Sequence, residues 1–208
     1  KMIESFRAGE DIHAHTAAQV FGLPQDQVTS ELRRRAKAVN FGIVYGISAF
    51  SLAQDIGVSR KEASDYMEKY LETFSGVRDY MERIKRQAKA DGYVSTLMGR
   101  RRWLPELNSS NFNLRAFGER VALNMPIQGT AADVMKLAMI RVAARLKAEG
   151  LQAQLILQVH DELIVECPQA EEAQVKEILT QEMEGAGSFS VPLIADANAG
   201  HSWAEAKG

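Results

Sequence analysis

The spacing of apolar side chains is helix-like in the first part of the chain. Through residues 1–91 they recur every three or four positions, the spacing of amphipathic α-helices. Ser59 precedes Glu62 by three residues, which is the capping-box arrangement at a helix start. We predict helices over 10–22, 29–46 (with Thr29 or Ser30 as N-cap), 59–74 and 77–90.

The spacing alternates between strand-like and helix-like beyond residue 92. Tyr93–Leu97 is typical of a short strand, and Asn108–Asn113 is a polar loop. Pro126 is expected to interrupt a helix, because proline removes a backbone hydrogen bond. The further elements predicted are helices over 114–124, 130–150 and 169–184, a buried β-hairpin over 155–166, and a last strand within 191–200.

These elements predict an α+β fold. A helical first subdomain is followed by a small antiparallel sheet with packed helices. The polar loop is the best boundary, which gives subdomains 1–112 and 113–208. The chain begins Lys1-Met2 and enters at once on an amphipathic pattern, so we expect it to be a piece of a longer protein.

Charge is divided unevenly between the two halves, although the net charge is only −2. Residues 1–104 hold 17 Lys and Arg against 13 Asp and Glu, whereas residues 105–208 hold 8 against 14. The basic excess comes from the clusters Arg33–Lys37 and Gly99–Trp103. A basic half beside an acidic half suits a site for polyanions and divalent metal ions. The alternative is two ordinary solvated faces.

Cysteine content and hydropathy indicate the compartment in which the protein works and whether it crosses a membrane. Cys167 is the only cysteine, so a disulfide within the chain is impossible, which fits a reducing, cytoplasmic compartment. No apolar run approaches the roughly 18 residues that indicate a membrane span, so we expect no membrane partner.

One predicted helix carries a stripe of cations followed by aromatics. Arg33, Lys37, Phe41 and Tyr45 recur every four residues. Arg33 and Phe41 are separated by roughly 12 Å along a helix, which is close to the length of a nucleoside triphosphate. The cations suit phosphates and the aromatics suit a sugar and base. The alternative is an exposed basic face that ends in core aromatics. Gly42 and Gly46 in this predicted helix suggest close approach of something flat to the backbone; for Gly46 the alternative is a helix C-cap.

The tip of the predicted hairpin carries the other candidate chemistry. His160, Asp161 and Glu162 separate the two apolar runs. Packing alone gives no reason to place an imidazole and two carboxylates there, and an ordinary polar turn is the alternative.

Three sequence blocks, in order, resemble the DNA polymerases of family A, the bacterial DNA polymerase I type. The first is the nucleotide-binding helix with Arg33, Lys37, Phe41 and Tyr45-Gly46. The others are Asn124–Asp133 and Gln158–Glu166, and the stretch Gly99–Leu107 is also similar to the family. The resemblance implies that 1–112 is the fingers subdomain and that 113–208 is the C-terminal part of the palm.

The resemblance implies a reaction and a nucleotide site. Family members add deoxynucleotides to a primer 3′ end by two-metal phosphoryl transfer with Mg²⁺. Asp161 would be a metal ligand, Glu162 an adjacent catalytic acid, and Lys37 a general acid for the leaving pyrophosphate. The residues that would bind the deoxynucleoside triphosphate are His13, Arg33, Lys37, Phe41 and Tyr45.

Primer–template DNA is the second partner that the resemblance implies. Arg120 and Gln128 would contact minor-groove acceptors shared by all correct base pairs. The other DNA-binding positions would be Arg115, Asn124 and His160, the last at the primer terminus. The enzyme would act in DNA replication and repair in the bacterial cytoplasm, associated with the nucleoid.

The chain also departs from the family pattern. The first catalytic aspartate and the DNA-gripping thumb lie upstream of its first residue, so one of the ligands for the two ions is missing. We therefore expect the isolated chain to be inactive, and an exposed palm edge to favour self-association.

Two other functions fit parts of the sequence. An HD-type metal phosphohydrolase would use His13, His15, His160 and Asp161. A non-catalytic helical DNA-binding module would use only the two arginine clusters and would bind with a steep dependence on salt.

Overall fold

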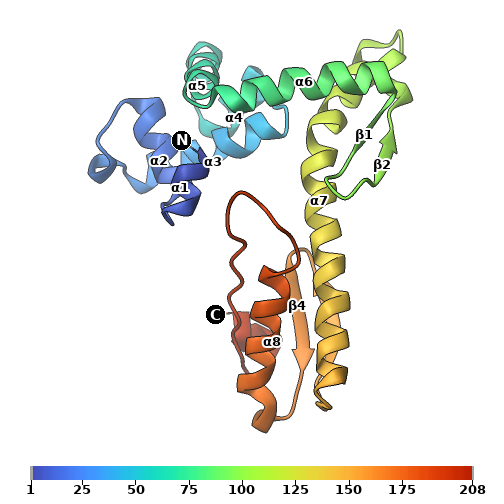
Figure 1. Ribbon diagram of the computed structural model, residues 1–208. Helices are drawn as coiled ribbons and strands as arrows, with labels where there is room; N and C mark the ends of the chain where they lie inside the picture. Colours follow the sequence, from blue (N-terminus) through green and yellow to red (C-terminus); the bar gives the residue numbers. More distant parts are fainter. Residues whose placement is uncertain (1, 208) are drawn as a thin grey trace. The chain divides into compact units, whose positions relative to one another are not determined.

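The computed structural model describes residues 2–207, which divide into two compact units. The first unit comprises residues 1–129 and the second residues 130–208. The division falls inside one long helix, α7 (Phe112–Ala148), drawn from yellow-green to orange in Figure 1. Each unit is described by itself below.

The first unit begins with six helices, which confirms the helical prediction for residues 1–91. Thr29 caps α3 by accepting a hydrogen bond from the Leu32 N–H, and Ser59 and Glu62 form the expected capping box at the start of α5. The helices are α1 (Met2–Arg7), α2 (Ile12–Phe21), α3 (Ser30–Val44), α4 (Ala49–Ile56), α5 (Arg60–Thr73) and α6 (Ser75–Asp91), with a 3₁₀ turn at Gln25–Gln27.

Helices α2 to α5 share one hydrophobic core. Val39 and Ile43 of α3 pack with Val20 of α2, Leu52 of α4 and Tyr70 of α5. Burial raises the pKa of the Tyr70 hydroxyl to about 12, because the phenolate would lose its hydration. Since α3 buries this face, its opposite face, with Arg33, Lys37 and Phe41, is left for solvent.

A short hairpin follows α6. Strand β1 (Tyr93–Ser95) pairs antiparallel with β2 (Arg101–Trp103), with Tyr93 opposite Trp103. The strand expected over 93–97 is therefore confirmed but shorter, and β2 was not predicted. Val94 packs with Ala88 of α6 and Ala122 of α7 in a second core. A 3₁₀ turn at Pro105–Asn108 leads into α7.

The predicted interruption at Pro126 is wrong. Helix α7 runs without a break from Phe112 to Ala148 and carries Pro126 inside it. A proline inside a helix costs roughly 3 kcal/mol through its missing N–H and its ring clash. Ala122 and Leu123 before it and Ala138 after it are fully buried, so packing of both flanking stretches offsets that cost.

The second unit is built on the predicted hairpin. Strand β3 (Gln154–Val159) pairs antiparallel with β4 (Glu162–Glu166), and a bulge lies between Leu155 and Leu157. A 3₁₀ turn at Gln169–Glu171 precedes α8 (Glu172–Glu184), and α9 (Trp203–Lys207) lies near the end of the chain. Val142 and Leu146 of α7 pack with Val175 and Ile178 of α8. The α+β fold class is confirmed.

Two expectations for this unit are wrong. The hairpin is not buried, because only one of its faces packs, through Leu163 and Val165; Ile156 and Leu157 are 54% and 46% exposed. Residues 191–200 form no strand, since neither strand of the described hairpin pairs with them. A strand needs a hydrogen-bonded neighbour, and apolar, β-branched sequence alone does not supply one.

Helix α7 also bears on the division into subdomains. The compact units meet between Gly129 and Thr130, whereas the boundary expected from the sequence lies at the start of this helix. The fingers and palm assignment, 1–112 and 113–208, stays a prediction. Within residues 2–207, no helix is both long and apolar enough to cross a membrane.

Candidate functional site

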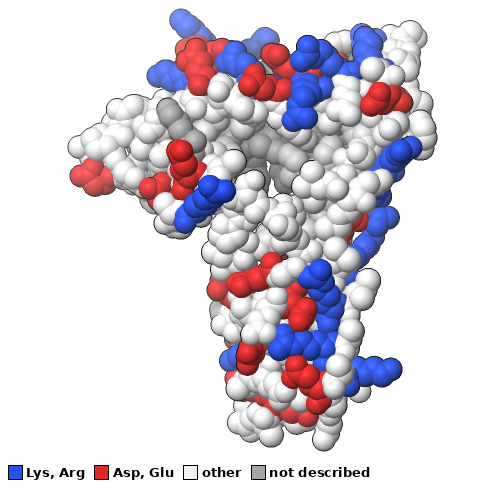
Figure 2. Space-filling view, in the orientation of Figure 1, with Lys and Arg blue, Asp and Glu red and all other residues white. Residues whose placement is uncertain are grey.

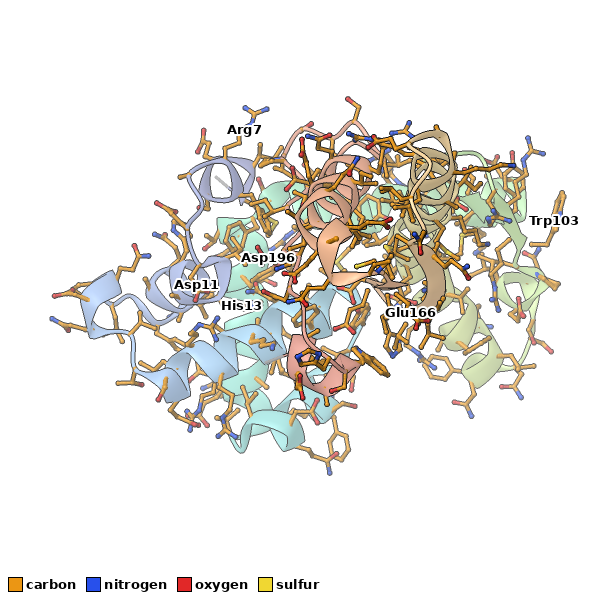
Figure 3. The ribbon with its side chains drawn as sticks, turned by 90° about the horizontal axis from the view of Figure 1, so that it is seen from below. Arg7, Asp11, His13, Trp103, Glu166 and Asp196 are labelled. Carbon is orange, nitrogen blue, oxygen red and sulfur yellow. The ribbon has the colours of Figure 1, made fainter. Side chains whose placement is uncertain are left out.

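The first candidate residues lie at the start of α2 and along α3. Asp11 caps α2 by accepting hydrogen bonds from the backbone N–H groups of His13 (2.9 Å) and Ala14 (3.1 Å). Its second carboxylate oxygen accepts from Arg33 Nε at 2.6 Å, and this bond lowers the pKa of Asp11. Figure 3 shows Asp11 and His13 together at this helix start. Arg33 is thus held at the start of the stripe.

A buried hydrogen-bond chain holds His13. Asn40 Nδ2 donates to His13 Nδ1 at 2.9 Å, and Asn40 Oδ1 accepts from the Thr16 hydroxyl at 3.1 Å. With Nδ1 occupied as an acceptor, the neutral ring carries its proton on Nε2. Burial lowers the pKa of His13, and the charges of Arg33 and Lys37 lower it further against the opposing effect of Asp11. The neutral ring therefore presents an Nε2–H donor near two cations.

The aromatic part of the stripe is exposed, as binding of a nucleotide would require. Phe41 and Tyr45 are 46% and 40% exposed, and their rings stack with centroids 6.1 Å apart. Lys37 Nζ lies 6.0 Å from the Phe41 centroid, and the centroid of the His13 ring lies 5.6 Å from it. The aromatics are not core residues. A cavity of about 360 Å³ beside them is lined by Ala38, Phe41, Gly42, Tyr45, Ile47 and Asp55.

Packing within the protein explains Gly42 of α3 and Gly46 just beyond its end, so they indicate no flat ligand at the backbone. A Cβ on Gly42 would lie 2.8 Å from Ile47 Cγ2. Gly46 has φ +71°, and a Cβ there would lie 3.2 Å from Leu123 Cδ1 of α7. The glycines let the chain turn tightly after α3 and let α7 approach it.

Three of the predicted DNA-binding residues share one groove on α7. Arg120, Asn124 and Gln128 are spaced four residues apart and so lie on one face of the helix. With Arg102 of β2 they line a cavity of about 430 Å³. Asn124 Oδ1 is buried and has no hydrogen-bond partner among residues 2–207.

Arg115 does not join this groove. Its guanidinium donates to the Ser109 carbonyl at 2.9 Å and lies 5.9 Å from the Phe112 ring. These contacts tie the start of α7 to the preceding loop, and the DNA-binding role of Arg115 stays a prediction.

The hairpin tip in the second unit carries the predicted catalytic acids. His160 and Asp161 form the exposed two-residue turn, and His160 has φ +52°, which is unusual for a residue other than glycine. Gln158 Nε2 donates to the His160 carbonyl at 2.7 Å and braces the turn. Glu162 Oε1 lies 3.2 Å from Lys207 Nζ, while its Oε2 is buried without a partner among residues 2–207.

These two carboxylates fit part of a Mg²⁺ site. Carboxylate oxygens are the ligands that Mg²⁺ prefers, and one or two of them together with substrate phosphates usually hold the ion. Within residues 2–207, no three His, Cys, Asp or Glu side chains gather as metal ligands. Asp161 and Glu162 can therefore supply only a share of the ligands. An HD-type hydrolase needs a cluster of metal ligands, so the described residues do not support that alternative.

The comparison with protein families decides the wider assignment. The chain matches DNA polymerase family A over residues 1–205. The chain belongs to this family. The resemblance of the three sequence blocks to family A is thereby confirmed, and it extends over nearly all of this chain.

Proteins similar in sequence to this chain are DNA polymerases of the same type. This family A chain is 52% identical over 207 residues to DNA polymerase I of Streptococcus pneumoniae serotype 4, covering 99% of this chain and 24% of the relative. It is 53% identical over 206 residues to DNA polymerase I of Bacillus subtilis, covering 99% of this chain and 23% of the relative. The chain thus spans about a quarter of the length of these relatives.

A solved structure agrees on the fold. The POL domain of Pol1 from M. smegmatis, in complex with DNA primer-template and dNTP, superposes on this family A chain with a TM-score of 0.95. The two are 47% identical, and the match covers 100% of this chain and 36% of the other.

Sequence reasoning missed the residues that hold the site together. Four contacting residues were not predicted: Asp11, Asn40 and Lys207, which contact predicted residues, and Thr16, which contacts Asn40. The N-cap position of Asp11, just before α2, was a usable signal. Nothing in the sequence indicated that Asn40 lies against His13, because 27 residues separate them.

Proposed function

We propose that this chain is part of a DNA-directed DNA polymerase that adds deoxynucleotides to a primer 3′ end. The observation that carries the proposal is the exposed stripe of Arg33, Lys37, Phe41 and Tyr45 on α3, with the His13 ring beside it. Membership of family A and the DNA polymerase I relatives support it.

In this proposal the stripe binds a deoxynucleoside triphosphate. Arg33, Lys37 and the Nε2–H of His13 contact the phosphates, and Asp11 holds Arg33 in place. Phe41 lies against the sugar, and Tyr45 lies near the templating base. The Lys37 ammonium donates its proton to the leaving pyrophosphate oxygen as the new phosphodiester bond forms.

The groove on α7 binds primer–template DNA. Arg120 and Gln128 donate hydrogen bonds to minor-groove acceptors, which check base-pair geometry without reading sequence. Asn124, which lines the same groove, adds a further contact. Arg115 contacts a backbone phosphate of the DNA while its guanidinium also donates to the Ser109 carbonyl. His160 contacts the primer terminus.

The hairpin tip supplies the protein's share of the metal chemistry. Asp161 and Glu162 would hold Mg²⁺ together with ligands from elsewhere. When bound, two such ions acidify the primer 3′-hydroxyl and neutralise charge on the leaving pyrophosphate. Because the described residues supply only these two acids, we expect the isolated chain not to polymerise. Replication and repair in the bacterial cytoplasm, at the nucleoid, follow from this function as predictions.

Primer extension tests the proposal. In the full-length protein, Lys37→Ala is expected to lower kcat by about 10²-fold or more, because a general acid contributes roughly that much. Lys61→Ala, which removes an exposed lysine of α5, is the control and is expected to leave the rate unchanged. If Lys37→Ala extends the primer as fast as the wild type, the role of Lys37 as general acid fails. If the full-length wild-type protein extends no primer, the polymerase assignment fails and the non-catalytic DNA-binding module takes its place.

We also propose that the isolated chain self-associates through its second unit. Each strand of the β3–β4 hairpin is paired on one edge only among residues 2–207, and Ile156 and Leu157 are exposed. Unpaired strand edges invite pairing with another chain. Light scattering is expected to show oligomers at high concentration, and fewer of them for Ile156→Lys. A monomer throughout the concentration range contradicts this.

A further inference from the structure

We propose that the solvent face of the β1–β2 hairpin is a binding site for single-stranded DNA, separate from the groove on α7. The site consists of Tyr93, Arg101 and Trp103, which we call the arginine–aromatic face. It uses none of the residues of the proposed nucleotide and primer–template sites. The inference therefore stands or falls independently of the polymerase activity.

Strand alternation separates this face from the groove. Val94 is opposite Arg102 in the hairpin; Val94 is buried in the core, and Arg102 lines the groove with Arg120 and Gln128. Successive side chains of a strand point to opposite faces. Arg101 and Trp103 therefore lie on the other face from Arg102, as does Tyr93, which is opposite Trp103.

The three side chains form an ordered and exposed aromatic platform. The Tyr93 and Trp103 rings meet edge to face with centroids 5.1 Å apart, and Arg101 Cζ lies 4.7 Å from the Tyr93 centroid. Trp103 is nonetheless 65% exposed, and Figure 3 shows it projecting from the hairpin. A large indole held in place but left open to water is suited to stack on a flat partner.

The surrounding charge is strongly basic. Residues 83–103 contain seven Lys and Arg and a single acid, Asp91, in a chain whose net charge is −2. Tyr80, Ile84 and Ala88 turn one side of α6 to the protein, so Arg86 and Lys89 lie toward its solvent side. Arg86, Lys89 and Arg101 form no ion pair within residues 2–207. Figure 2 shows basic side chains along α6 and beside the hairpin, with acidic side chains among those of α6.

This combination favours single-stranded DNA over other polyanions. Bases of a single strand expose their faces and stack on aromatic side chains, whereas bases of a duplex are covered by their neighbours. Guanidinium and ammonium groups around the platform suit the phosphates. An acidic protein would use the charges but would have no need of the exposed indole. Membership of a DNA polymerase family makes DNA the strand to expect.

Tryptophan fluorescence gives a direct test in the 208-residue chain. The chain has two tryptophans, Trp103 and Trp203, so Trp203→Phe leaves Trp103 as the only reporter. Oligo(dT) of about 15 nucleotides is the probe, since sites of this kind span roughly 4–16 nucleotides. We expect saturable quenching of Trp103. Trp103→Ala, followed by anisotropy of labelled oligo(dT), is expected to raise Kd about tenfold, and Trp103→Phe to restore most of the affinity.

The salt dependence separates specific from general attraction. Arg101→Gln is expected to reduce the slope of log Kd against log salt by about 0.7, the loss of one phosphate contact. Arg60→Gln, an exposed arginine at the start of α5, is the charge-matched control and should leave the slope unchanged. Circular dichroism melts check that each variant is folded.

Three outcomes would overturn the proposal. One is the absence of Trp103 quenching by oligo(dT). Another is an unchanged Kd for a folded Trp103→Ala variant, since binding would then lie elsewhere. The third is equal binding of oligo(rU) or of polyglutamate at the same salt, which would mean that the face binds RNA or any polyanion.

Discussion

Asn40 donates a hydrogen bond from its side chain to Nδ1 of His13 at 2.9 Å, across 27 residues of sequence. Asn40 is buried, and its carbonyl oxygen is held by the hydroxyl of Thr16, which is also buried. The amide cannot rotate without losing both bonds. The bond therefore fixes which ring nitrogen of His13 carries the proton and where that proton points.

The first prediction concerns this positioning. Asn40→Leu in the full-length protein removes the donor and is expected to raise KM for deoxynucleoside triphosphates about tenfold, because His13 loses its orientation. The Kd for primer–template DNA should stay unchanged. The measurement is steady-state primer extension with a parallel DNA-binding assay. Thr16→Val, which removes only the outer bond of the chain, is the milder control. Equal losses in both assays would mean that Asn40 acts through stability alone.

His13 also gives a pH prediction for stability. Its pKa is lowered in the folded chain by burial and by Arg33 and Lys37, so the unfolded chain binds the proton more tightly. Stability is therefore fully present above the unfolded value of about 6.5 and is lost as the pH falls through the lower folded pKa. His13→Gln should flatten this part of the curve. The pKa of Asp11 is also lowered, from a starting value of 3.8, so its effect lies in a more acidic range.

Urea unfolding of the isolated chain at several pH values between 5 and 7.5 makes the measurement. His15→Gln is the matched control, because His15 lies on the same helix and pairs with Glu10 at 3.4 Å rather than with the buried chain. A wild-type curve that is flat across this range, or a His13→Gln curve as steep as that of the wild type, would contradict the prediction.

Two glycines are expected to respond to alanine in opposite directions. Gly46 has φ +71° and faces Leu123 at 3.2 Å, so Gly46→Ala should destabilise the chain by about 1–2 kcal/mol. Gly76 lies in α6 with open space around it, so Gly76→Ala should stabilise the chain by about 0.5–1 kcal/mol. Thermal or urea unfolding measures both, and changes of the same sign would contradict the argument.

Two glycines, Gly42 in α3 and Gly46 just beyond its end, show how much the sequence alone predicts and where tertiary contacts decide. The four-residue spacing of Arg33 to Tyr45 predicted an exposed stripe, and the structure has it. The spacing could not reveal Ile47 and Leu123 as the reasons for Gly42 and Gly46. Local periodicity reports which face a side chain occupies, whereas the contacts across that face depend on residues distant in sequence.

The same limit explains the errors in the fold. Helix α7 continues through Pro126 because its neighbouring turns are buried, a tertiary effect that local propensity omits. Residues 191–200 have strand-like composition, yet they find no pairing partner among the described strands. By contrast, the caps at Thr29 and Ser59 were predicted correctly, because capping involves only residues within one turn.

The turn at His160 gives the last prediction, in which stability and function should move apart. A residue other than glycine at φ +52° costs roughly 1–2 kcal/mol, and strained residues that persist often serve a site. His160→Gly should therefore stabilise the isolated chain by about 1 kcal/mol, while in the full-length protein it weakens extension from the primer terminus. His160→Ala loses the same imidazole but keeps Cβ, so it should match the loss of activity without the gain in stability.

Gln158→Ala removes the hydrogen bond to the His160 carbonyl and should destabilise the chain. Differential scanning calorimetry and primer extension on the three variants decide the matter: if His160→Gly and His160→Ala melt at the same temperature, the turn is not strained.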